Sequence, residues 1–285
     1  MATAGSLIEN IKKLYGDPDA DFITDAVGLD WLNRAQKRFV HFVLPLDEFK
    51  DYPITAKQPR FDLPTNCIIP IGVMWYQTRV NKLEYVAPDK WQKIEEVWPQ
   101  AVGIPDAYTV LRRQLTVGPQ VPSTNSATAL ASGAMTSAVT TLNLTAASGT
   151  FRTKGFVKVD SEVVEYTAIT STTLTGCVRG VHGTNNTSHA SNATVTQMDL
   201  IMLYRKAPAD LSATSSTPDV PDFCVEYLEK YALYLAWVAR GDSEKAGMIY
   251  EEFKEFEKET IKTIGRRSKD GLMRIQDSLN RPRWW

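Results

Sequence analysis

The sequence has little that marks a membrane protein or a secreted protein. Its three cysteines, Cys67, Cys177 and Cys224, are widely spaced and form no CxxC pair. This usage is typical of buried thiols in a reducing compartment, not of a disulfide framework. The longest apolar run covers residues 231–239, far fewer than the roughly 20 residues that span a bilayer. The first residues also lack the basic and apolar segments of a signal peptide. We therefore expect a soluble protein without a membrane segment.

A surplus of positive charge is also missing. The 285 residues hold 32 Lys and Arg against 33 Asp and Glu, a formal net charge of -1. A protein that coats nucleic acid needs a basic surplus somewhere on its surface. The balance therefore excludes a general nucleic-acid coat and leaves room only for local basic patches.

Histidine is scarce, and the usual catalytic motifs are missing. His41 lies in a helical segment beside Phe39, as packed or surface histidines do. His182 and His189 follow Cys177 with C-x4-H-x6-H spacing, which is not a recognised zinc arrangement and lacks a fourth ligand. The sequence contains no GxSxG, HExxH or GxxxxGK[ST] motif. We expect no catalytic residue, no metal and no cofactor.

Two acids, Glu162 and Glu165, are the remaining candidates for paired carboxylates. Residues three apart on a strand point to opposite faces, so the two cannot flank one bond. We expect both to be solvated strand carboxylates.

Four helices are predicted from both ends of the chain. Ser6 and Glu9 have the spacing of a capping box, and Gly16 follows the last apolar residue of the first helix. Residues 231–239 are apolar on every side, which predicts a central helix enclosed by other elements with Trp237 in the core. The four helical ranges are 6–15, 24–42, 222–240 and 242–264.

The middle of the chain predicts β structure of two kinds. Between residues 52 and 122, nine prolines separate short apolar runs, which predicts a small antiparallel sheet with at most one short helix from Pro88. Residues 123–207 contain no proline and no tryptophan and are rich in Thr, Ser, Ala and Gly. Period-two alternation within this segment argues against a disordered linker and predicts strands, with hairpin turns at 160–161 and 171–172.

The predicted fold class is therefore α+β. A four-helix core with a small antiparallel sheet is formed by residues 1–122 and 199–285, and an inserted, sandwich-like all-β domain by residues 123–198. The ends of the insert are expected to lie close together, because the segments that it interrupts would otherwise be adjacent.

The C-terminal part has an uneven charge distribution. Residues 222–264 hold ten acids against six bases, whereas residues 265–285 hold six bases against two acids. A basic tail after an acidic helix pair is suited to an acidic surface, for example on a neighbouring copy. Arginine and tryptophan are also enriched at binding hot spots. The candidate partner-binding residues are Arg266, Arg267, Arg274, Arg281, Arg283, Trp284 and Trp285.

Five motifs, in this order, resemble the head-to-tail adaptor (connector) proteins of tailed bacteriophages. They are DWLNRAQ at 30–36, VGPQVP at 117–122, LIMLYRKAP at 200–208, PDVPDF at 218–223 and GDSEKA at 241–246. The segments TLNLTAASG at 141–149, GFVKVDSEVVEYT at 155–167 and LTGCVRGVHGT at 174–184 resemble a small β-rich module of phage virion proteins. Adaptors of the family often run straight from the proline-rich turn into the next strand, so the role of the module cannot be carried over.

The adaptor resemblance implies a structural, non-enzymatic protein of the virion neck, made in the host bacterial cytoplasm. Family members form a ring, commonly of twelve copies, that docks on the portal protein, meets a tail or nozzle protein and extends the DNA channel used in genome ejection. DNA would pass through without sequence-specific binding. In that setting the candidate tail residues would contact the portal or a neighbouring subunit. A tail or baseplate component and a carbohydrate-binding tail protein are the alternatives.

Overall fold

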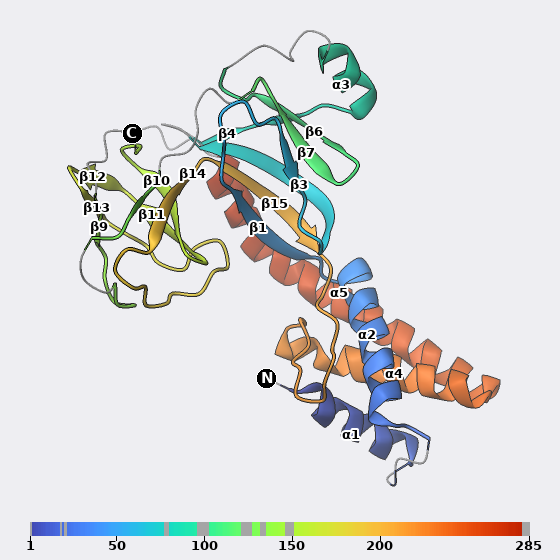
Figure 1. Ribbon diagram of the computed structural model, residues 1–285. Coiled ribbons are helices and arrows are strands. Elements are labelled where there is room, and N and C mark those ends of the chain that lie inside the picture. The colour runs from blue at the N-terminus through green and yellow to red at the C-terminus, as the bar shows by residue number, and fades with distance from the viewer. Residues whose placement is uncertain are drawn as a thin grey trace. The chain divides into compact units, whose positions relative to one another are not determined.

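The computed structural model describes residues 2–17, 19, 22–76, 80–95, 103–120, 127–131, 135–145 and 151–280 (Figure 1). At 80, 92–95 and 263–280 it describes the backbone alone. The chain divides into two compact units: a helical unit of Met1–Leu46 and Ala207–Trp285, and a β unit of Asp47–Lys206. The described residues form five α-helices and several small, mainly antiparallel sheets, which confirms the α+β class.

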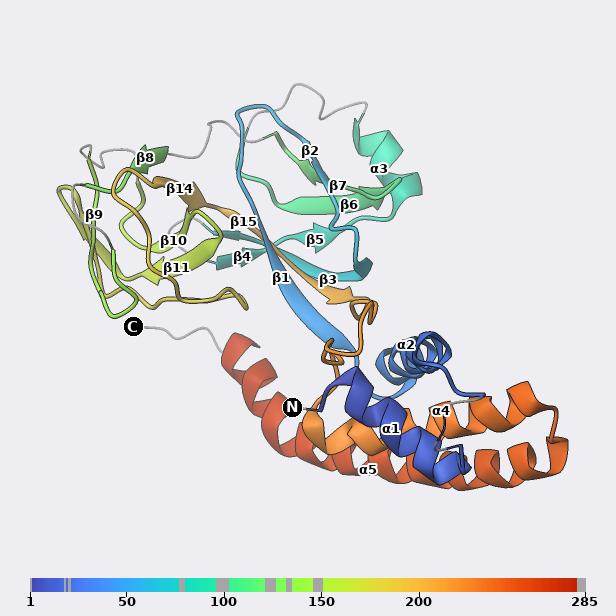
Figure 2. The ribbon, with the colours of Figure 1, turned by 60° about the horizontal axis from the view of Figure 1, so that its bottom comes forward.

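The helical unit is built from four α-helices, which Figure 2 labels. They are α1 (Ala4–Tyr15), α2 (Asp25–Phe42), α4 (Val225–Arg240) and α5 (Ser243–Asn280), with a 3-10 turn at Asp222–Cys224 before α4. The capping prediction for α1 is wrong by one turn: the helix begins at Ala4, and Thr3 caps it by accepting a hydrogen bond from the Ser6 amide at 3.3 Å. Gly16 ends α1 in the left-handed conformation, at φ 85°, as a C-terminal glycine should.

The contact between α1 and α2 depends on a glycine. A Cβ atom on Gly28 would meet Cγ1 of the fully buried Ile8 at 2.7 Å, which no real Cβ contact tolerates. Gly28 is a poor helix former at an interior position of α2. Its presence is explained by the close approach of α1.

The helix predicted to be central, α4, does pack against α1, α2 and α5, but it is not enclosed on every side. Its fully buried residues are Tyr227, Leu228, Ala232 and Ala236, and Tyr231, Leu233, Leu235 and Trp237 are partly buried against the same core. Val238 is 48% exposed. Trp237 packs at the edge of the core against the Tyr15 ring, 4.6 Å away, and the Lys245 ammonium lies 4.4 Å from its ring centroid. The prediction of a central helix is therefore confirmed, whereas the prediction of full enclosure is wrong, because Trp237 is only partly buried.

A buried ion pair joins three helices of this unit. The Arg38 guanidinium on α2 donates to both carboxylate oxygens of Glu257 on α5, at 3.1 and 3.2 Å. The Tyr227 hydroxyl on α4 donates to the same carboxylate at 2.7 Å. Burial by itself would raise the pKa of Glu257, but these hydrogen bonds lower it below its usual value. The carboxylate is therefore an ionised link between the helices.

The helix predicted to end near residue 264 continues to Asn280 as part of α5. Arg266, Arg267 and Arg274 thus lie on a continuous helical backbone, whereas Arg281, Arg283, Trp284 and Trp285 lie outside the described residues. None of the helices in the described part of the chain combines the length and the apolar character that crossing a bilayer requires.

Two sheets of the β unit share a core. The first has the strand order β1 (Leu46–Tyr52), β15 (Leu200–Lys206), β3 (Cys67–Tyr76), β4 (Val80–Lys82). The second has the order β2 (Arg60–Asp62), β7 (Gln114–Gly118), β6 (Ala107–Leu111), β5 (Glu84–Tyr85). The short helix α3 (Pro88–Glu95) follows β5, as the proline at its start predicts. Val73 and Trp75 from the first sheet and Leu115 and Val117 from the second belong to one buried cluster.

Residues 127–198 of the same unit form two further sheets around a separate core. One has the order β11 (Glu162–Tyr166), β10 (Gly155–Val159), β14 (Thr194–Met198), β8 (Ala127–Ala129). The other has the order β12 (Ala168–Thr170), β13 (Thr173–Thr175), β9 (Leu142–Asn143). Both predicted hairpin turns are confirmed, and their first residues, Asp160 and Ser171, adopt φ values of 51° and 52°.

The two ends of this segment leave it side by side. The strand β8 pairs with β14, with Ala127 opposite Thr196 and Ala129 opposite Thr194. After β14 the chain enters β15 of the first sheet through Asp199. Ala127 and Thr196 are therefore neighbours, whereas the N-terminal end of the predicted insert, residues 123–126, lies outside the described residues.

Candidate functional site

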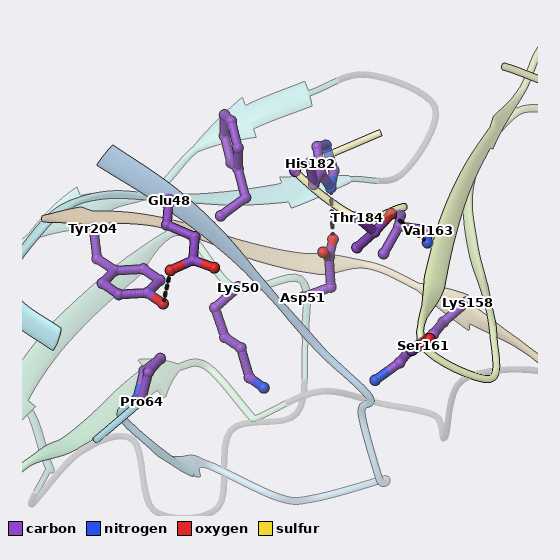
Figure 3. A pocket seen from close by; sticks show the side chains of 12 residues that line it. Glu48, Lys50, Asp51, Pro64, Lys158, Ser161, Val163, His182, Thr184 and Tyr204 are labelled. Carbon is purple, nitrogen blue, oxygen red and sulfur yellow. Dashed lines mark hydrogen bonds and ion pairs between the residues drawn. The ribbon is translucent and has the colours of Figure 1, made fainter. Parts of the chain in front are cut away.

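An open pocket lies where strand β1 meets the loop that follows β13 (Figure 3). Its volume is about 230 Å³, and all of its lining residues belong to the β unit. The charged and hydroxyl-bearing lining residues are Glu48, Lys50, Asp51, Lys158, Ser161, His182, Thr184 and Tyr204. The pocket is thus polar and formed by segments far apart in the sequence.

His182 holds one wall of the pocket in place. Its Nδ1 atom lies 2.9 Å from Oδ1 of Asp51 on β1 (Figure 3). Its ring packs against Phe49 on β1 and Phe156 on β10, with centroid distances of 4.8 and 4.5 Å. His182 therefore connects the loop after β13 to strands β1 and β10. This structural role accounts for the position of His182 without a metal ion.

The opposite wall is held by Tyr204 and Glu48. The Tyr204 hydroxyl donates to the Glu48 carboxylate at 2.9 Å (Figure 3). Burial, with this hydrogen bond, raises the pKa of Tyr204, so the phenol remains a donor. Within the described residues Lys50 and Lys158 form no ion pair, so the pocket keeps two cationic groups that could meet an acidic partner.

A second polar cluster is buried beside the β10–β11 turn. Glu162 is fully buried, and its carboxylate accepts hydrogen bonds from Arg179 Nε at 2.6 Å and Arg179 Nη2 at 2.7 Å. The backbone amides of Gly180 and Thr187 donate to it at 2.9 and 3.1 Å, and Nε2 of His189 lies 2.8 Å away. One carboxylate thus fixes two loop segments against the start of β11.

This arrangement corrects the prediction that Glu162 is solvated. Burial by itself would raise the pKa of Glu162, but the hydrogen bonds from Arg179, His189 and the two amides outweigh burial and lower it to about 2. Glu165, three residues along β11, is only half-buried. The two acids do face different surroundings, as their spacing predicts, but the buried member has a structural role.

The two histidines and Cys177 do not come together. His189 lies between Asp160, at 2.8 Å from Nδ1, and Glu162, whereas His182 contacts Asp51. Cys177 is buried, with its thiol 3.5 Å from the Leu174 carbonyl oxygen. Among the residues for which coordinates are described, no group of three His, Cys, Asp or Glu is placed to hold a metal ion.

A second pocket lies in the helical unit, between the antiparallel helices α4 and α5. Its volume is about 390 Å³. We call it the α4–α5 groove; its lining residues are Leu14, Glu226, Glu229, Lys230, Leu233, Ile249, Glu252 and Phe253. It combines an apolar floor with an acidic rim. Sequence analysis gave the acidic character of this region but could not locate the groove, because the groove depends on how the two helices pack.

Sequence reasoning also missed Arg152, Asp199 and Arg179. Arg152 forms two hydrogen bonds with the Asp199 carboxylate, at 2.9 and 2.6 Å, and so holds the loop before β10 to the junction of β14 and β15. Arg152 and Arg179 are the two arginines of residues 123–198, but no motif marks their partners. Such pairs are visible only once the strands are in register.

Comparison with known proteins gives a family. The model of the SU10 adaptor protein family matches residues 2–276, a range that includes residues 123–198. No curated protein matches the chain. The family is one of bacteriophage structural adaptors, which contact other head and tail proteins in the virion, and it is not an enzyme family. Because the match covers nearly the whole sequence, the chain belongs to the SU10 adaptor protein family.

Proposed function

We propose that this protein is a subunit of the neck adaptor ring that connects the portal of the phage head to the tail and extends the DNA channel. The observation that carries the proposal is the family match over residues 2–276, which spans both the helical unit and the β unit. The partners are the portal protein on one side, a tail or nozzle protein on the other, and further copies of the same chain. We expect about twelve copies in the assembled ring, as is common among portal adaptors, with DNA passing through without sequence-specific contacts.

The helical unit offers surfaces suited to ring contacts. Leu14, Val238, Met248 and Ile261 are large apolar side chains with exposed fractions of 62%, 48%, 64% and 41%. These side chains, on α1, α4 and α5, are available for burial against a neighbouring subunit. A ring needs two different surfaces on each subunit, because each copy contacts one neighbour on either side.

The basic C-terminal segment belongs to the same proposal. The candidate partner-binding residues are Arg266, Arg267, Arg274, Arg281, Arg283, Trp284 and Trp285, facing the portal or a neighbouring subunit. Arg267 and Arg274 are two turns apart on α5, so their backbone positions lie on the same side of that helix. A basic row that continues a long helix is suited to an acidic partner surface.

Residues 123–198 are proposed to be an inserted, sandwich-like domain within an adaptor framework of residues 1–122 and 199–285. Their separate buried cluster and the pairing of β8 with β14 support this division. When the chain is divided only by how compactly its parts pack, residues 123–198 fall in the same unit as the two sheets formed by β1–β7 and β15. The three links to those sheets, through His182, Arg152 and Phe156, would hold the insert in a fixed orientation.

Docking of the full chain onto purified, DNA-free portal rings tests the proposal. We expect a stable complex, and a reconstruction of it should show a ring of this chain on one end of the portal. The tail or nozzle protein should bind only after this ring has formed. A chain that stays unbound by portal rings but enters isolated tails or baseplates would contradict the neck assignment.

A further inference from the structure

The α4–α5 groove has a floor and a rim of different chemistry. Leu233 and Ile249 are half-buried and Phe253 is fully buried, so the floor is apolar. Leu14, from α1, stands at the edge with 62% exposure. The volume of about 390 Å³ lies within the roughly 300–1,000 Å³ of pockets that hold organic groups such as an aromatic ring.

The rim carries an excess of negative charge. Its acids are Glu226, Glu229 and Glu252, and its single cation, Lys230, is 3.5 Å from the Glu226 carboxylate. Glu229 accepts a hydrogen bond from the neutral side chain of Asn10 at 2.9 Å. Glu252 is exposed and has no cationic partner in the part of the chain that the structure describes. A ligand for this groove should therefore be apolar at its centre and positively charged beside it.

Residues 281–285 of this chain, Arg-Pro-Arg-Trp-Trp, have that chemistry. Two indole rings suit an apolar floor, and two guanidinium groups suit the carboxylates of the rim. Arginine and tryptophan are the residue types that most often carry binding energy at interfaces. Proline limits the backbone freedom that such a short segment would lose on binding.

The segment cannot occupy the groove of its own subunit. From Glu252, which lines the groove, α5 continues for 28 residues to Asn280, a rise of roughly 42 Å at about 1.5 Å per residue. Residues 281–285, even fully extended, span at most about 18 Å. Trp284 and Trp285 can therefore reach only the groove of another copy.

We propose that Arg281–Trp285 of one subunit binds in the α4–α5 groove of a neighbouring subunit, with the tryptophans on the apolar floor and the arginines against Glu229 and Glu252. Such a contact is heterologous, since tail and groove are different surfaces, and contacts of this kind form a ring when the rotation between neighbouring copies closes. This deepens the proposed function, on which it rests, by naming the contact between copies. It assigns the tail to a second copy of the chain and not to the portal.

Peptide binding tests the proposal directly. The probe is a fluorescent peptide of residues 276–285, and the receptor is the full chain carrying Trp284→Ala and Trp285→Ala, whose own tail no longer competes. Fluorescence anisotropy should show saturable binding that weakens as salt is added. A peptide with both tryptophans replaced by alanine should bind roughly 30-fold more weakly, the loss typical of a hot-spot residue.

Two matched charge reversals on one turn of α5 locate the site. Glu252→Lys, at the groove, should weaken binding roughly fivefold, because an attraction becomes a repulsion. Glu251→Lys makes the same change at an exposed residue that does not line the groove and should leave binding unchanged. Equal far-UV circular dichroism spectra and melting temperatures would show that both variants fold.

Each remaining outcome overturns the proposal. Absence of binding, or equal binding to the two charge variants, would mean that the groove does not hold the tail. Binding of the same peptide to portal rings but not to this chain would assign the tail to the portal. In that case the neck proposal would survive, because it is tested separately by docking of the full chain.

Discussion

Replacing Glu162 by Gln should destabilise the 127–198 segment more than any other single conservative change to a carboxylate there. The substitution keeps the shape of the side chain but removes its charge, leaving the Arg179 guanidinium, whose side chain is only 5% exposed, without its counter-ion. Removing one member of a buried ion pair typically costs about 3–5 kcal/mol. The pKa of Glu162 gives a similar magnitude: the difference between 4.5 and about 2 corresponds to about 3 kcal/mol at neutral pH.

The sign of the pH dependence follows from the lowered pKa. A carboxylate with a lower pKa in the folded state stabilises that state fully above its unfolded value of about 4.5. The stabilisation decreases as the pH falls from about 4.5 toward 2, where the folded carboxylate itself becomes protonated. The difference in stability between the wild type and Glu162→Gln should therefore be constant from pH 6 to 7 and shrink below pH 4.5.

The assay must report on this segment in particular. Residues 123–207 contain no tryptophan, so tryptophan fluorescence would not follow their unfolding. Amide hydrogen exchange of β10 and β11 measures the free energy of local opening directly. Glu165→Gln is the matched control, because the same change on the same strand affects a half-buried residue and should stay within about 0.5 kcal/mol.

A loss below 1 kcal/mol for Glu162→Gln at pH 7, or a loss that grows as the pH falls below 4.5, would refute the reasoning. The first result would mean that the Arg179 pair contributes nothing net. The second would mean that the sign of the pKa change is wrong.

Three other predictions concern the remaining architecture. Replacing residues 123–198 with a short Gly/Ser linker should leave a helical protein that unfolds cooperatively, because the segment has its own core. A non-cooperative melt, followed by circular dichroism, would show that the rest of the protein depends on this segment for its core. Phe253→Ala should lower the free energy of unfolding, measured in urea, by about 3–5 kcal/mol, and Trp237→Ala should lower it clearly less because that ring is only partly buried. Equal losses would contradict the placement of Trp237 at the edge of the core. Gly28→Ala should lower the free energy of unfolding by about 1–2 kcal/mol despite the better helix propensity of alanine, because its Cβ would collide with Ile8; a stabilised variant would contradict that contact.

Much of the local structure follows from the sequence alone. The hairpin turns at Asp160 and Ser171, the end of α1 at Gly16 and the start of α3 at Pro88 depend on backbone preferences of a few adjacent residues. The α+β class follows in the same way, because apolar residues repeat with helical spacing near both ends and with period two in the middle. The adaptor family is indicated by motifs that the sequence shows in order.

Other features were decided only by packing. Charge and spacing made Glu162 look like a solvated strand residue, since Arg179 and His189 are distant in sequence and meet it only when the strands are paired. The apolar run at 231–239 predicted an enclosed helix, but the packing of α1, α2 and α5 leaves residues 238–239 exposed. The α4–α5 groove forms because two helices pack side by side, with acidic side chains of both helices on either side of the gap between them. Local sequence sets which conformations a segment prefers, whereas burial and partnership depend on residues that only the folded chain brings together.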